Sequence, residues 1–179
     1  MPIFASIADT VLDGFGVFDD AQDYMDRTKQ LKQEARVKLK TIMKLVQDSK
    51  TDIEVADEPG DVDSATVKQA IAISEDLIQE IADVEKQGQR LTQKAQKDKE
   101  LWPKVSGELG KTTKALADFS VKAKELTSNL KTLWDDHKKA VKELKQEKGE
   151  HRTAKQVAAT VATVLGVIGG VLLVAKNIG

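Results

Sequence analysis

The fold of this chain is decided by the stretch at residues 105–144, VSGELGKTTKALADFSVKAKELTSNLKTLWDDHKKAVKEL. Its seam positions recur at alternating steps of four and three residues, which is the spacing of a coiled-coil seam. These positions are Val105, Leu109, Thr112, Leu116, Phe119, Ala123, Leu126, Leu130, Leu133, His137, Ala140 and Leu144. Since a helix rises about 1.5 Å per residue, the stretch predicts one helix roughly 60 Å long and an elongated molecule.

Two earlier stretches carry the same helical spacing. The first is marked by Ala21, Tyr24, Thr28, Leu31, Ala35, Leu39, Ile42 and Val46, and the second by Val67, Ile71, Ser74, Ile78, Ile81, Val84, Gly88, Leu91 and Ala95. Pro59-Gly60 predicts a loop at about residues 49–63, and Trp102-Pro103 predicts a turn at about 101–104. No segment alternates convincingly with a period of two residues. The sequence therefore predicts an all-α fold, an elongated bundle of long amphipathic helices.

Composition excludes several classes of function. The chain has 179 residues, 28 Lys and Arg against 29 Asp and Glu, and no cysteine. A disulfide framework and a thiolate metal site are excluded. Because positive and negative charges nearly balance, the chain has no overall basic field, and no nucleic-acid partner is predicted. Charge is nevertheless uneven, with a net of +6 over residues 27–50 and −9 over residues 52–83. These segments either face each other as antiparallel helices or form solvated faces.

Motifs that would support enzymatic chemistry are incomplete. The sequence at 107–112, GELGKT, lacks the earlier glycine and the preceding strand of a phosphate-binding loop, so a helix start is the better interpretation. Asp61-Val62-Asp63 lacks the glycine and glutamate of a calcium loop. His137 lies on the predicted seam, where a packed side chain is expected. We therefore predict no enzyme, no cofactor, no metal site and no small-molecule substrate.

A long uncharged run divides the chain into a helical bundle at 1–156 and a candidate membrane-inserting helix at 157–175. The run is VAATVATVLGVIGGVLLVA, 19 residues without a charge, flanked by Lys155 and Lys176. As a helix it spans roughly 28 Å, close to the thickness of bilayer hydrocarbon. The side chains expected to enter lipid, or an apolar groove of the bundle, are Val157, Val161, Val164, Leu165, Ile168, Leu172 and Leu173.

Small residues recur every four positions within this run. They are Ala158, Ala162, Gly166 and Gly170, and they form a ladder on one helical face. In lipid, where the hydrophobic effect no longer drives helices together, such ladders let backbones approach closely. The ladder therefore predicts helix packing or self-association. Gly169-Gly170 between β-branched residues also fits a hairpin, although a helix is favoured.

The N-terminal arm, residues 1–20, carries a second apolar stripe. It consists of Ile3, Phe4, Ile7, Val11, Phe15 and Phe18, with aspartates on the opposite face. This arm either packs along the bundle or enters a membrane once its aspartates are neutralised. Its lack of a basic start and its early aspartates do not fit a secretory signal peptide.

The architecture resembles α-helical pore-forming proteins of the cytolysin A type. The resemblance rests on long amphipathic helices, a Gly- and Ala-rich apolar segment and the absence of cysteine. The basic amphipathic stretch that ends in LKTIMKLVQD, residues 39–48, is also similar to the membrane-attacking helical bundles of HeLo and mixed-lineage-kinase-like proteins. Cytolysin-type proteins are longer and usually carry the apolar segment internally, and no functional residue is carried over from either family.

These features lead to one functional hypothesis and two alternatives. The hypothesis is a bundle that is soluble before insertion, oligomerises, and inserts apolar helices to perforate or remodel a membrane. Its partners would be a lipid bilayer and either further copies of the chain or a helical partner protein. The first alternative is a tail-anchored coiled-coil tether that binds a partner helix. The second is a soluble bundle in which residues 157–175 are only core.

Overall fold

A computed structural model of the chain describes residues 17–55, 65–100, 102–145 and 152–178. Within these ranges the chain forms four long helices: α2 at Val17–Val55, α3 at Ala65–Ala95, α4 at Trp102–Lys145 and α5 at Arg152–Lys176. The described residues contain no strand. The predicted all-α fold is therefore confirmed.

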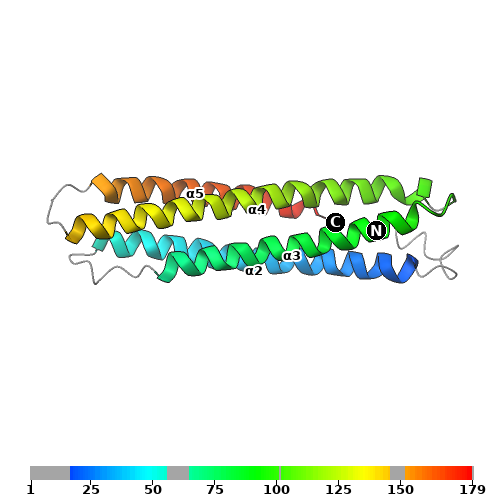
Figure 1. Cartoon of the computed structure of the whole chain (residues 1–179), viewed down its shortest axis with the longest axis horizontal. Helices are drawn as coiled ribbons and strands as arrows, with labels where there is room; N and C mark the ends of the chain where they lie inside the picture. The colour runs from blue at the N-terminus through cyan, green and yellow to red at the C-terminus, as the bar shows by residue number, and fades with distance from the viewer. Residues whose placement is uncertain (1–16, 56–64, 101, 146–151, 179) are drawn as a thin grey trace.

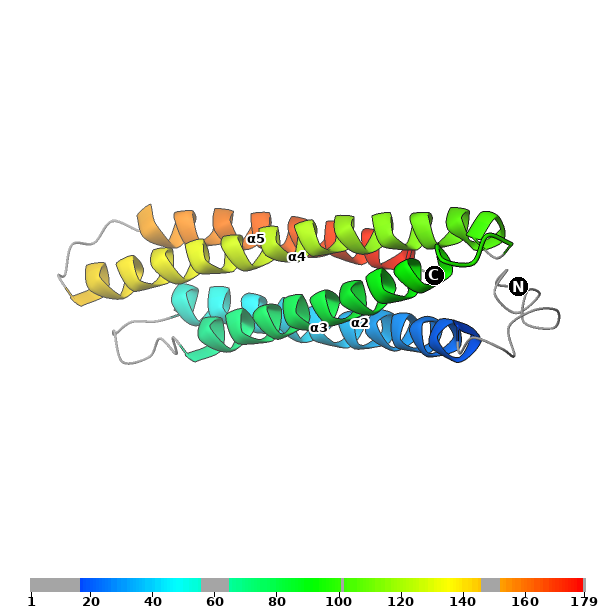
Figure 2. The same cartoon turned by 45° about the vertical axis from the view of Figure 1, so that its right-hand side comes forward.

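Successive helices run antiparallel to one another in one elongated bundle (Figure 1). Helix α3 packs against α2 and α4, and α5 packs against α4 and α2, so α5 lies across the bundle from α3. In a second, rotated view α5 again lies beside α4 (Figure 2). With 44 residues, α4 is about 66 Å long, whereas the 25 residues of α5 span only about 38 Å. The predicted elongated shape follows from these lengths.

The predicted seams account for most of the core. All eight seam positions predicted for α2 are buried, from Ala21 to Val46, and so are most of those in α4, including Phe119 and Leu126. In α3 the prediction is wrong at two positions. Ile71 and Ile78 are only partly buried, and Ala70 and Leu77 take their places in the seam. Both sets fit a three-four spacing, and the contacts of α3 with two neighbours select between them.

Two predicted boundaries need correction. The loop predicted at about 49–63 starts too early, because α2 continues to Val55 and buries Ser49. The turn predicted at about 101–104 is already helix from Trp102 onward. Pro103 lies in the first turn of α4, where a helix needs no backbone N–H donor and tolerates proline.

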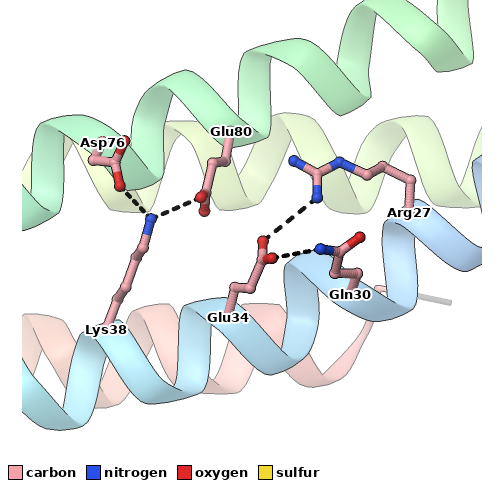
Figure 3. Close-up of polar contacts among 6 residues, drawn as sticks. All are labelled: Arg27, Gln30, Glu34, Lys38, Asp76 and Glu80. Atoms are coloured by element: carbon pink, nitrogen blue, oxygen red, sulfur yellow. Dashed lines mark hydrogen bonds and ion pairs between the residues drawn. The ribbon is translucent and has the colours of Figure 1, made fainter.

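Opposite charges meet where α2 and α3 pack together. Lys38 of α2 lies between two carboxylates of α3 and donates to Asp76 and, at 2.7 Å, to Glu80 (Figure 3). On α2 itself, Glu34 accepts a 2.7 Å hydrogen bond from Gln30 and pairs with Arg27 at 3.6 Å. Of the two alternatives for the basic and acidic segments, the facing arrangement is therefore seen at Lys38.

Candidate functional site

The uncharged run folds as predicted into one helix, α5. It is continuous through Gly169 and Gly170, so the alternative hairpin does not form. Among the described residues, one segment is long and apolar enough to cross a membrane, Lys155–Lys176. Between these two lysines the helix carries no charged side chain.

The large residues of α5 mostly point into the bundle. Val157, Val161, Val164 and Ile168 are each 2% exposed or less, and they pack in the same core as the seams of the other helices. Leu165 and Leu172 are partly buried against this core, whereas Leu173 is 64% exposed. Most of the side chains predicted to enter lipid thus fill the apolar groove of the bundle in this structure.

The small-residue ladder lies on the other side of the helix. Ala162 and Gly166 are exposed, and Ala158 and Gly170 are partly buried. A Cβ atom built on Gly166, Gly169 or Gly170 would have no neighbouring heavy atom within 4 Å outside the helix backbone and adjacent residues. At Gly166 and Gly170 the ladder therefore faces open space.

We define the outer face of α5 by its exposed uncharged residues between Gln156 and Lys176. They are Ala159, Ala162, Thr163, Gly166, Gly169 and Leu173. Helices of soluble bundles normally place charged and polar side chains on this side, as α2, α3 and α4 do. Only 28% of the most apolar part of α5 is buried. Helix α5 differs from α2, α3 and α4 in that the exposed side of this part carries no charge.

Polar contacts attach the start of α5 to α4. The carboxylate of Asp136 is 4% exposed, and it accepts a 2.6 Å hydrogen bond from Thr160 Oγ1 and a 3.2 Å bond from Gln156 Nε2. Lys139 lies 4.0 Å from the same carboxylate. Since a buried carboxylate is stable only when its oxygens have partners, these bonds fix the position of α5 along α4.

A second polar contact attaches the end of α5 to α2. Lys32 Nζ donates to the backbone carbonyls of Lys176 and Ile178, at 3.0 and 3.3 Å. The last carbonyls of a helix lack partners within the helix, and a cation satisfies them and complements the helix dipole. Helix α5 is thus held by polar contacts near both ends and by apolar packing between them.

The N-terminal stripe falls largely outside the described residues. Ile3, Phe4, Ile7, Val11 and Phe15 lie there, and Phe18 belongs to the first turn of α2. The structure therefore leaves the two hypotheses for this arm as predictions.

Enzymatic motifs gain no support from the described part of the chain. Residues 107–112 lie within α4, so this segment is helix, although the helix starts earlier than predicted, at Trp102. Gly107 and Gly110 face open space. His137 is fully buried on the seam of α4. Within the described ranges no three His, Asp or Glu side chains gather as a metal site would need.

Sequence analysis missed the contacts that hold α5 in place. Asp136 adjoins the seam position His137, and an acid beside a seam is a signal for a polar partner on the neighbouring helix. Nothing in the sequence indicates that Lys32 reaches the end of α5, since that contact joins segments more than 140 residues apart.

Comparisons with known protein families, curated proteins and solved structures find no match.

Proposed function

We propose that this protein is a membrane-inserting helical bundle in which α5 enters a lipid bilayer, associates with further copies and perforates or remodels the membrane. The observation that carries the proposal is the outer face of α5, which is uncharged from Gln156 to Ala175 although it is exposed. A helix spanning a bilayer must be free of charge on every side, whereas a helix on a soluble bundle needs only one apolar side.

Packing of α5 supports a soluble state before insertion. The inner row, with Val161, Val164 and Ile168, is covered by the bundle. Transfer of this row from the core to lipid exchanges one apolar environment for another, and the outer face gains an apolar environment that it lacks in water. A permanently anchored tether has no need of a bundle groove for its anchor.

Self-association is the second part of the proposal. Gly166 and Gly170 of the ladder face open space, and small side chains permit close approach of a second helix in lipid. Gly166 and Gly170 are therefore available to pair with another copy once α5 has left the bundle. Such association would favour the inserted state.

A charge placed on the outer face tests insertion without disturbing the bundle. Gly166→Asp introduces a carboxylate at an exposed position with open space around it. A charge at the centre of an inserted helix costs about 2.5–3.5 kcal/mol. We expect roughly 100-fold less release of an encapsulated dye from liposomes. Gly110→Asp, at an exposed position of α4 with open space, is the matched control.

The results separate the proposal from its alternatives. Leakage by the parent and by Gly110→Asp, together with loss of leakage in Gly166→Asp, supports insertion of α5. Equal leakage by both variants would contradict it. Recovery of the parent with liposomes without leakage would favour the tether, and absence of any membrane binding would favour a bundle in which α5 is only a structural helix.

A further inference from the structure

Cationic side chains form a row along α2, the helix that packs beside α5. The row begins next to Lys32, which contacts the end of α5. Arg36, Lys40 and Lys44 follow at intervals of four residues, and residues so spaced are neighbours on a helix surface. All three side chains are exposed. We call Arg36, Lys40 and Lys44 the cationic row.

No acidic side chain among the described residues pairs with the cationic row. Among the described residues, none of its three members makes an ion pair within 4 Å. Lys38, in contrast, lies on the side of α2 that faces α3, where Asp76 and Glu80 hold it. Like charges four residues apart repel by a few tenths of a kcal/mol per pair, so the row weakens α2 slightly in water.

The opposite border of α5 has a different character. On α4, Lys122 pairs with Glu125 at 2.7 Å, and Lys139 lies 4.0 Å from Asp136. These two cations of α4 are therefore matched by acids of the same helix. Lys155 and Lys176, both exposed, lie at the two ends of the uncharged part of α5. The uncharged face of α5 thus has a cation at each end, and the neighbouring helix α2 carries the exposed cationic row.

We infer that the α2–α5 surface recognises anionic phospholipid headgroups and that the cationic row brings the outer face of α5 onto the membrane. The inference rests on the proposed function for the role of α5. The interface of an anionic bilayer binds surfaces that combine apolar residues with Lys and Arg. The apolar residues contact the lipid tails, and the cations contact the headgroups. A nucleic acid would use the row alone, because its phosphates gain nothing from an uncharged helix face.

The test removes two charges from the row and two from elsewhere. Arg36→Gln with Lys40→Gln is the test variant, and Arg90→Gln with Lys124→Gln is the matched control. All four side chains are exposed and form no ion pair within the described ranges. Arg90 is on α3, and Lys124 shares a face of α4 with Thr127 and Lys131, which contact α3. The control charges therefore lie away from α5.

Binding is measured by co-sedimentation with vesicles of phosphatidylcholine, with and without phosphatidylserine. Each cation near an anionic surface contributes about fivefold to binding, so the test variant should bind phosphatidylserine vesicles roughly 30-fold more weakly. The control variant should bind like the parent, and added salt should weaken the parent toward the test variant. Circular dichroism should show equal helix content in all three proteins.

Several outcomes would overturn the inference. These are equal binding to vesicles with and without phosphatidylserine, equal losses in both variants, or release from the vesicles by a duplex oligonucleotide at equal phosphate concentration. Dye leakage is read separately. Anionic-specific binding without leakage would keep the lipid inference and reject perforation. Leakage of neutral vesicles by parent and test variant alike would keep perforation and reject the lipid inference.

Discussion

Tyr24 of α2 packs directly against the backbone of Gly88 in α3. A Cβ atom on Gly88 would lie 2.8 Å from Tyr24 Oη and 3.0 Å from two ring carbons. Both residues are buried, and Tyr24 is among the largest fully buried side chains of the molecule. Glycine is therefore required at this position by the close approach of the ring.

Gly88→Ala should destabilise the bundle. Overpacking against Tyr24 costs about 1–3 kcal/mol, which exceeds the roughly 1 kcal/mol that alanine gains over glycine within a helix. Gly110→Ala is the matched control, because its Cβ would meet no atom within 4 Å. The control should gain up to about 1 kcal/mol. Urea unfolding of both variants measures the difference, and a Gly88→Ala protein as stable as the control would refute the tight contact.

The single tyrosine of the chain, Tyr24, should lose its proton only at a pH well above the usual value for tyrosine. Burial, followed by the nearby carboxylate of Glu85, raises the pKa of Tyr24 from 10.0 to about 12. Because the folded state holds this proton more tightly, the associated stability is complete below about pH 10 and is lost as pH rises toward about 12. Tyrosinate absorbance reports Tyr24 alone, since the chain has one tyrosine. A midpoint near 10 in the folded protein would contradict the prediction.

Tyr24→Phe should remove this alkaline sensitivity with little loss of stability. The buried Tyr24 hydroxyl has no hydrogen-bond partner in the described part of the chain, so the substitution breaks no hydrogen bond.

Lys38 makes a separate contribution to the loss of stability at alkaline pH. Burial lowers its pKa, but hydrogen bonds to Asp76 and Glu80 and attraction to both carboxylates more than offset this and raise it. Stability from Lys38 is therefore lost only as pH rises above its ordinary pKa of 10.5.

Thr160→Val should loosen α5. The substitution removes the 2.6 Å hydrogen bond to Asp136 and leaves a buried carboxylate with one donor fewer, at a cost of about 1–3 kcal/mol. Thr163→Val is the control, because Thr163 is exposed and bonds only within its own helix. That change should stay within about 0.5 kcal/mol. Hydrogen exchange of α5 amides measures the effect, and equal protection in both variants would show that Asp136 does not hold α5.

Gly166→Leu should weaken association in membranes without weakening the bundle. No atom lies within 4 Å of the added Cβ, so the soluble fold should keep its stability. A bulky side chain on the ladder separates helices in lipid, and we expect about tenfold weaker association. Gly107→Leu, in open space on α4, is the control. Energy transfer between labelled copies in vesicles measures association, and unchanged transfer would remove the ladder from the proposal.

Helical spacing predicted the whole seam of α2 and most of the seam of α4, where Thr112 is only partly buried. Every predicted position of α2 from Ala21 to Val46 is buried, because a regular three-four spacing leaves one side of a helix apolar. In α3 the spacing fits two seams, and Ile71 and Ile78 are large enough to suggest the wrong one. Which seam is buried depends on the volume between three helices, and this is not encoded in α3 alone.

The orientation of α5 could not be predicted from its sequence. The ladder and the large apolar residues were both visible, and either side of an uncharged helix can face a bundle. In the structure the side that carries Val157, Val161 and Val164 faces inward, whereas Leu173 stays exposed. Asp136 beside the seam signals a polar partner, but the identity of that partner and the contact of Lys32 depend on how the helices pack.

Insertion of the outer face of α5 is tested most directly by a fluorescent label on that face. The chain has no cysteine, so Ala162→Cys provides one attachment site for an environment-sensitive dye, and Gln89→Cys on α3 provides the control. Both positions are exposed in the bundle. With anionic vesicles, we predict that the dye at residue 162 brightens and is quenched by nitroxides on the lipid chains, while the dye at residue 89 is unaffected. A dye at residue 162 that remains in water while the protein is bound to the vesicles would contradict insertion of α5.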